Sequence, residues 1–222
     1  MGGWLVLEPW ITPSIFQKLD GSGIIDEYTL TQKLGAQAAH DQVLKPHWDN
    51  WVQLSDFQKI KASGFNLVRI PVGYWAFDNS GSPYAKGAAD YLEKGVQWAR
   101  QVGVKVIIDL HGAPGSQNGF DNSGQKTSPG WQQGDTVART LSVLRTIQEK
   151  YASSDYDDVV AAIENLNEPL DPALNPDITR QFHRDSYGNQ RVVSQSRTFM
   201  FHDGFMPPSS YNGFLTPSDN NA

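Results

Sequence analysis

The sequence predicts a single domain with an α/β fold, built on a parallel sheet of about five strand–helix units. Three observations carry this prediction. Short apolar runs alternate along the chain with longer segments of helical periodicity, which is the order found in β/α units. Polar residues and glycines gather directly after the apolar runs. No repeat, low-complexity tract or linker divides the 222 residues into two domains.

The first third of the chain has fewer regular patterns than the rest. Residues 4–7 form an apolar run that predicts a short first strand, and a long irregular stretch follows with one short helix over 26–35. A helix is expected over 48–63, because its apolar side chains recur near one face and Gly64 can end it. Residues 65–70 then predict the second strand.

The patterns become clearer after residue 90. Asp90 can cap a helix over 91–101. Residues 104–110 predict the most clearly buried strand of the chain. Asp135 can cap the best helical pattern, whose apolar residues keep the spacing of an amphipathic helix. The remaining elements expected are a strand over 159–166, a helix over 177–187 and a fifth strand over 198–202.

Polar side chains lie where the predicted strands end. Arg69 closes the second strand, Asp109 and His111 close the third, and Asn167 and Glu168 follow the fourth. The carboxyl ends of the strands form the mouth of a β/α barrel, where the active sites of such enzymes lie. The same ends bind ligands in doubly wound sheets. The pattern therefore predicts a site at these ends without separating the two architectures.

Composition and missing motifs exclude several classes of protein. A net charge of −6 argues against nucleic-acid binding. The absence of cysteine excludes disulfides, zinc–thiolate sites and a cysteine nucleophile. No apolar run approaches the length of a membrane span, and no signal peptide is present in these residues. Without a dinucleotide fingerprint, a P-loop or His and Asp residues at ligand spacing, neither a cofactor nor a metal is expected.

Three residues could carry chemistry, and each has a structural alternative. Glu168, which lies between Asn167 and Pro169, suits a proton donor in glycoside hydrolysis; alternatively, it belongs to a solvated loop in which Pro169 merely ends a strand. Arg69 could orient a catalytic carboxylate or form a structural salt bridge. His111 could hydrogen-bond a sugar hydroxyl or be a satisfied histidine inside a barrel.

Five motifs, in the same order along the chain, resemble the fungal exo-β-1,3-glucanases of glycoside hydrolase family 5. They are residues 2–10, residues 64–72, the segment 109–124 that is rich in glycine and asparagine, Asn167-Glu168-Pro169, and His202-Asp203 with residues 212–216. The resemblance covers residues 2 to about 216, although residues 171–197 match poorly. It implies a (β/α)8 TIM barrel of which this chain covers about the first five units.

The resemblance also implies an activity and the residues that perform it. The activity is that of a retaining glucosidase which releases glucose from β-1,3-glucan ends, outside the cell or in the cell wall. Glu168 would be the acid/base, and Glu8 would bind hydroxyls of the terminal glucose. Trp10 stands where many relatives carry Tyr. The other substrate-binding residues would be Arg69, His111 and Asn167 around the cleaved bond, and Phe120 and Asn122 at the next sugar.

The family's nucleophile, a second Glu on a later strand, has no counterpart in these 222 residues. The chain therefore resembles the first half or so of such an enzyme. Two alternatives stay open: a non-catalytic carbohydrate-binding half-barrel, and a subunit that another chain or a C-terminal half completes. If the chain is active by itself, Asp109, Asp121 and Asp203 are the first candidates for the second carboxylate, because each lies at or just after a strand end.

Overall fold

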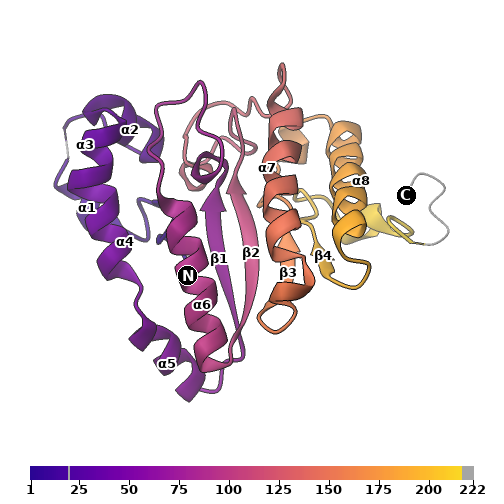
Figure 1. Ribbon diagram of the computed structural model, residues 1–222. Coiled ribbons are helices and arrows are strands. Elements are labelled where there is room, and N and C mark those ends of the chain that lie inside the picture. The colour runs from indigo at the N-terminus through magenta and orange to yellow at the C-terminus, as the bar shows by residue number, and fades with distance from the viewer. Residues whose placement is uncertain (20, 217–222) are drawn as a thin grey trace.

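Four parallel strands form one sheet, and they lie side by side in the order of the chain in the computed structural model, which describes residues 1–19 and 21–216. The strands are β1 (Leu67–Gly73), β2 (Lys105–Gly112), β3 (Val160–Glu164) and β4 (Thr198–Met200). The helices between them lie on one face of the sheet (Figure 1), and they are α6 (Ala88–Val102), α7 (Thr136–Tyr151) and α8 (Pro176–Val193). The predicted alternation of parallel strands and helices is confirmed.

The segment predicted as a first strand, residues 4–7, is fully buried, but among the described residues it makes a single contact of the sheet type. Leu5 forms a single parallel bridge with Val72 of β1. The Leu7 backbone N–H donates instead to the carboxylate of Glu27, at 2.8 Å. A side chain thus takes a donor that a strand would give to its neighbour, so the expected strand is reduced to one bridge.

The N-terminal third is more helical than predicted. Asp26 caps the expected helix by accepting a hydrogen bond from the Thr29 backbone N–H at 2.7 Å, which confirms a helix within 26–35. The other helical segments before β1 were not predicted as separate elements. The helices of this region are α1 (Pro13–Gln17), α2 (Glu27–Leu34), α3 (Ala36–Ala39), a π-helical turn (His40–Leu44), α4 (Lys45–Trp51) and α5 (Leu54–Ala62).

The single helix predicted over 48–63 is wrong, because the chain is extended at Val52 and Gln53. The Gln53 backbone N–H donates to Asp56 Oδ2 at 3.0 Å, and the Asp56 backbone N–H donates to the Gln53 carbonyl oxygen at 2.9 Å. This local pairing begins a new helix at Leu54 and outweighs the continuous apolar pattern. The result is two short helices, α4 and α5, which meet at an extended corner.

Other boundaries differ by a few residues. α6 begins at Ala88 with Gly87 as its cap, at a φ of 126°, so Asp90 lies in the first turn and does not cap the helix. Asp135 precedes α7 as expected, although its side chain makes no capping bond. α8 runs past residue 187 to Val193.

The main core lies between the sheet and its helices. Ile70 of β1 and Ile108 of β2 are fully buried, as are Leu92 and Val96 of α6. Successive strand residues face opposite sides of a sheet, so Arg69 and every second residue from it face the side away from the helices.

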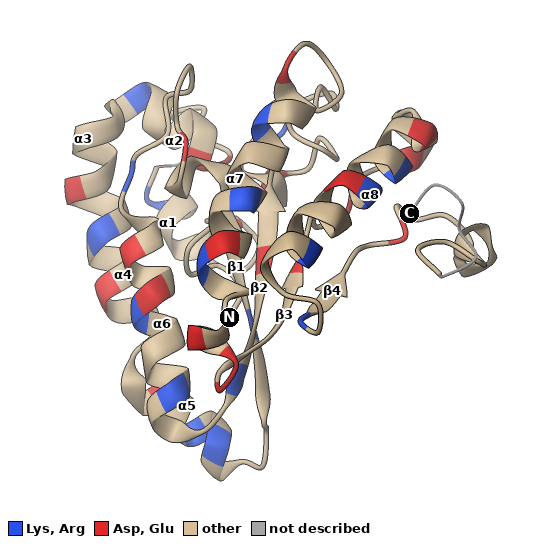
Figure 2. Ribbon diagram, turned by 45° about the vertical axis from the view of Figure 1, so that its right-hand side comes forward, with Lys and Arg blue, Asp and Glu red and all other residues tan. Residues whose placement is uncertain are grey.

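Both signs of charge occur along α4, α6 and α8 (Figure 2). Within the described ranges, every helix is too short or too polar to cross a membrane.

A buried carboxyl group joins the N-terminal segment to the sheet. Glu27 of α2 is 1% exposed and accepts hydrogen bonds from the Leu7 backbone N–H at 2.8 Å and from Trp75 Nε1 at 2.9 Å. The Trp75 ring stacks on Tyr84 with 4.0 Å between centroids, and both rings are buried, so the carboxyl group bonds into an apolar part of the core. Burial raises the pKa of Glu27 from 4.5 to about 7.

This shift makes the free energy of unfolding depend on pH. Between its ordinary pKa of 4.5 and about 7, the folded state keeps a proton on Glu27 that the unfolded chain releases. Stability is therefore expected to fall as pH rises through this window, by about 3 kcal/mol at most from this group. Urea unfolding at about pH 5 and pH 8 measures the effect. Glu27→Gln should lack this part of the pH dependence; equal pH dependence in both proteins would contradict the prediction.

Candidate active site

A cleft of about 260 Å³ lies at the carboxyl ends of β1, β2 and β3. Trp10 and Pro71 line its edge. Phe120, which was expected at a neighbouring sugar site, does not line this cleft, and its side chain is 44% exposed. The structure brings the other predicted site residues together around it: Glu8, Arg69, His111, Asn122, Asn167 and Glu168.

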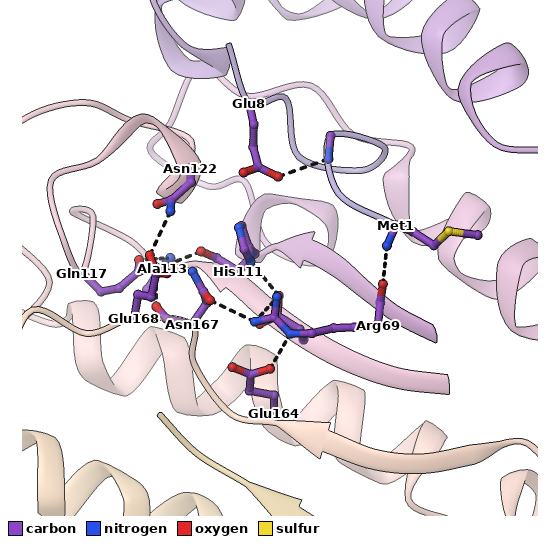
Figure 3. Close-up of polar contacts among 12 residues, drawn as sticks. Met1, Glu8, Arg69, His111, Ala113, Gln117, Asn122, Glu164, Asn167 and Glu168 are labelled. Carbon is purple, nitrogen blue, oxygen red and sulfur yellow. Dashed lines mark hydrogen bonds and ion pairs between the residues drawn. The ribbon is translucent and has the colours of Figure 1, made fainter. Parts of the chain in front are cut away.

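The floor of the cleft is organised by Arg69 of β1 (Figure 3). Its Nε donates to Glu164 Oε2 of β3 at 2.6 Å, and its Nη2 lies 3.1 Å from Asp109 Oδ2 of β2. Asp109 and Glu164 lie opposite each other in the register of the two parallel strands. Both carboxylates are almost fully buried, so the guanidinium is the cation that compensates them.

The pKa values of this cluster follow from burial and from its charges. Burial raises the pKa of Glu164, and the neighbouring Asp109 carboxylate raises it further, against the opposite effect of Arg69. Burial alone would lower the pKa of His111. The Asp109 carboxylate, 2.6 Å from His111 Nδ1, outweighs burial, so that the pKa of His111 is raised. Asp109 therefore stabilises the protonated form of His111 against the effect of burial.

Two side-chain nitrogens in this floor have no hydrogen-bond partner within the described residues. Asn167 accepts from Arg69 Nη2 through Oδ1, at 2.9 Å, and this contact fixes which way its amide points. Asn167 Nδ2 and His111 Nε2 remain unpaired although they are buried. Buried polar atoms without partners are uncommon and need an explanation. Since both residues line the cleft, these nitrogens are candidates to bond a ligand there.

Glu168 lies on the turn that follows β3, in a strained backbone conformation. Its φ is 48°, in the left-handed region that costs a residue with a Cβ about 1–3 kcal/mol. Pro169 restricts its backbone further. Asn122 Nδ2 donates to Glu168 Oε2 at 2.9 Å, so the segment after β2 holds the carboxylate from the side. Such strain persists only where surrounding contacts enforce it, and it is typical of functional sites.

Glu8 approaches the cleft from the N-terminal segment. Its side chain is 4% exposed, and its Oε1 accepts a hydrogen bond from the Gly3 backbone N–H at 3.1 Å. The turn around it closes through bonds from the backbone N–H groups of Ile11 and Thr12 to the Glu8 carbonyl oxygen. One face of the cleft is therefore built from residues far in sequence from the strands.

The sequence interpretation missed two members of this site. Glu164 lies inside the predicted strand 159–166 and carries no motif, so its pairing with Asp109 follows only from the strand register. The signal that could have found it is its parity: a carboxylate inside an apolar strand must meet a cation. Gln117, fully buried in the segment after β2, was also missed, because its role depends on backbone groups that it contacts across the site.

The chain is similar to proteins of known family. Residues 35–184 match the family described as cellulase (glycosyl hydrolase family 5). The probable glucan 1,3-beta-glucosidase A of Emericella nidulans is 47% identical over 218 residues, which cover 97% of this chain and 53% of that protein. The glucan 1,3-beta-glucosidase of Schwanniomyces occidentalis is 48% identical over 222 residues, which cover 97% and 52%. The chain spans about half the length of the curated relatives it matches.

Solved structures show the same architecture. Rutinosidase from Aspergillus niger superimposes with a TM-score of 0.86 at 24% identity, covering 100% of this chain and 65% of its own. An endoglucanase of Pseudomonas stutzeri gives a TM-score of 0.52 at 18% identity, covering 68% and 43%. These likenesses confirm the predicted fold class, a TIM-barrel type, and this chain covers part of each of those structures.

Proposed function

The chain belongs to glycosyl hydrolase family 5, and on that premise we propose that it forms the acid/base side of the active site of a retaining exo-β-1,3-glucanase. Such an enzyme releases glucose from the ends of β-1,3-glucan. The names of the curated relatives support the substrate. The observation that carries the proposal is the position of Glu168, which shares one cleft with the unpaired nitrogens of His111 and Asn167.

Glu168 would donate a proton to the glycosidic oxygen while the bond from that oxygen to the anomeric carbon breaks. In the second step it would take a proton from the water that releases the sugar. Asn167 Nδ2 and His111 Nε2 would bond hydroxyls of the glucose, and Glu8 would accept bonds from others. Arg69, which bonds Asn167 Oδ1, would act through that amide.

The neighbouring sugar would lie over Trp10 and Asn122, which line the cleft, and would extend toward Phe120 in the same segment as Asn122. Aromatic rings offer flat apolar faces, and Trp10 is 73% exposed beside the cleft. Asn122 would exchange its bond with Glu168 for one with the sugar. Because β-glucan is a large polymer that does not cross membranes, we place this protein outside the cell or in the cell wall.

A retaining mechanism requires a second carboxylate about 5–5.5 Å from the acid. Among the described residues, Glu8 is the other carboxylate that lines the cleft, and Asp109 and Glu164 are bonded to Arg69. This observation favours a second candidate function, a carbohydrate-binding half-barrel without chemistry, alone or completed by another chain. The two candidates differ in whether Glu168 transfers a proton.

To test whether Glu168 transfers a proton, azide is added as a small anionic nucleophile that takes the role of the second carboxylate. Azide attacks the anomeric carbon of an aryl β-glucoside from the α face while the bond to the aryl oxygen breaks. Glu168 donates its proton to that oxygen, which gives α-glucosyl azide and the phenol. Without azide we expect hydrolysis several orders of magnitude slower than that of a complete enzyme, as when a member of a catalytic unit is removed. With azide, phenol release should become measurable.

Laminaribiose binding, followed by NMR, separates the outcomes. Binding together with azide-dependent phenol release supports the acid/base proposal. Binding without release supports the binding module, and no binding contradicts both. Full hydrolysis without azide would reveal a second carboxylate within this chain, and Glu8→Gln, Asp109→Asn, Asp121→Asn and Asp203→Asn would then locate it.

A further inference from the structure

One buried glutamine connects the two loops that meet at the cleft. Gln117, 0% exposed, lies in the segment after β2 (Figure 3). Its Nε2 donates to the carbonyl oxygens of His111 and Asn167, both at 2.8 Å. Its Oε1 accepts from the Ala113 backbone N–H at 3.0 Å. One amide therefore fixes the backbone at the end of β2 and the backbone just before Glu168.

The backbone of Gln117 holds the other side of the same turn. The Leu170 N–H donates to the Gln117 carbonyl oxygen at 3.0 Å. Gln117 thus bonds the chain on both sides of Glu168, at Asn167 and at Leu170. These are contacts of the kind that a residue at a φ of 48° needs, because its strained backbone would otherwise relax.

We propose that Gln117 is a positioning residue, which holds Glu168 in the left-handed conformation that directs its carboxylate into the cleft. The inference rests on the proposed acid role of Glu168. Gln117 itself faces backbone groups, so it acts on the reaction through the Asn167 carbonyl oxygen and the Glu168 peptide. A displacement of the acid by about 1 Å lowers proton transfer on the order of 100-fold.

The test uses the full chain with two substitutions of the same chemical kind. Gln117→Met keeps the length of the side chain and removes its amide. Gln148→Met is the matched control: Gln148 of α7 is also 0% exposed, and its Nε2 donates to the Ser186 carbonyl oxygen at 3.1 Å, in the contact between α7 and α8. Both variants lose one buried amide, so a general loss of stability affects both.

Two readouts distinguish positioning from stability. Azide-dependent release of a methylphenol, a poor leaving group, needs the proton of Glu168, whereas release of dinitrophenol does not. Gln117→Met should lower the former by about 10- to 100-fold and leave the latter within a few-fold. The intraresidue NOE between the amide and α protons of Glu168, which is strong at a positive φ, should weaken in the same variant. Gln148→Met should change neither readout.

Retention of the strong NOE in Gln117→Met, or an equal loss for both leaving groups, would overturn the proposal. A wild-type chain that shows no dependence on the leaving group would refute the acid role of Glu168. The NOE comparison would still decide whether Gln117 sets the conformation of that residue, so the two failures are distinguishable.

Discussion

Glu168→Gln is expected to lower azide-dependent release of a methylphenol by about 10²–10⁴-fold, the usual contribution of a general acid. The amide has nearly the shape of the carboxyl group, and its oxygen can still accept the bond from Asn122 Nδ2. It has no proton of suitable acidity for the leaving oxygen. The poor leaving group must then depart as an anion, and its release becomes slow.

The leaving group supplies the internal control. Dinitrophenol departs without protonation, so its release should change only a few-fold in Glu168→Gln. Glu149→Gln, an exposed position on α7 paired with Arg145 Nε at 2.9 Å, should leave both rates unchanged. If Glu168→Gln slows both substrates equally, the role of Glu168 lies in binding or folding and not in proton transfer.

Arg69→Met is expected to lower the free energy of unfolding by about 3–5 kcal/mol, because it leaves buried charges without their counter-ion. Asp109 and Glu164 each lose a bond to the guanidinium and stay in a site that water hardly reaches. Since whole domains are stable by only about 5–15 kcal/mol, a large part of the protein's stability is at stake. Urea unfolding of both proteins at neutral pH measures the difference.

Two further variants test whether the lost stability comes from the buried charges. Adding Glu164→Gln to Arg69→Met should restore part of the loss, since it removes the buried carboxylate that Arg69 Nε bonds at 2.6 Å, whereas Asp109 keeps its contact with His111. Arg145→Met breaks an exposed ion pair with Glu149 and should cost less than about 1 kcal/mol. A loss below about 1 kcal/mol in Arg69→Met would show that the cluster adapts, by proton uptake or water entry, more easily than its burial indicates.

The strand–helix order could be predicted because it depends on local patterns. β2 is an apolar run and α7 keeps one apolar face, and both signals are contained within the element itself. The single helix predicted over 48–63 was wrong because the prediction used the same kind of local apolar pattern and nothing else. The apolar spacing runs on across residues 52 and 53, but the Asp56 carboxylate, which accepts from the Gln53 backbone N–H, marks where the new helix begins.

The site was predictable in part. Arg69, His111 and Glu168 stand at strand ends, where parallel strands bring side chains together whatever the rest of the fold. Glu164 and Gln117 could not be found in this way. Glu164 meets Asp109 only because Arg69, on another strand, contacts both carboxylates. Gln117 meets the Asn167 carbonyl oxygen across two loops. Only the packed chain brings these groups within bonding distance.

The cluster beneath the cleft has a consequence for how this protein can change over evolutionary time. It joins Arg69 to the carboxylates of Asp109 and Glu164, and Asp109 to His111, so each group is bonded to another member. A single mutation at any of these positions unbalances the rest, so the floor can drift only by paired changes. Trp10, at the edge of the cleft, and Phe120, beyond it, are 73% and 44% exposed and have no such charge partners to match. New sugar preferences should therefore arise, in nature or in directed selection, from substitutions at such exposed positions, while the charged cluster beneath the cleft is inherited unchanged.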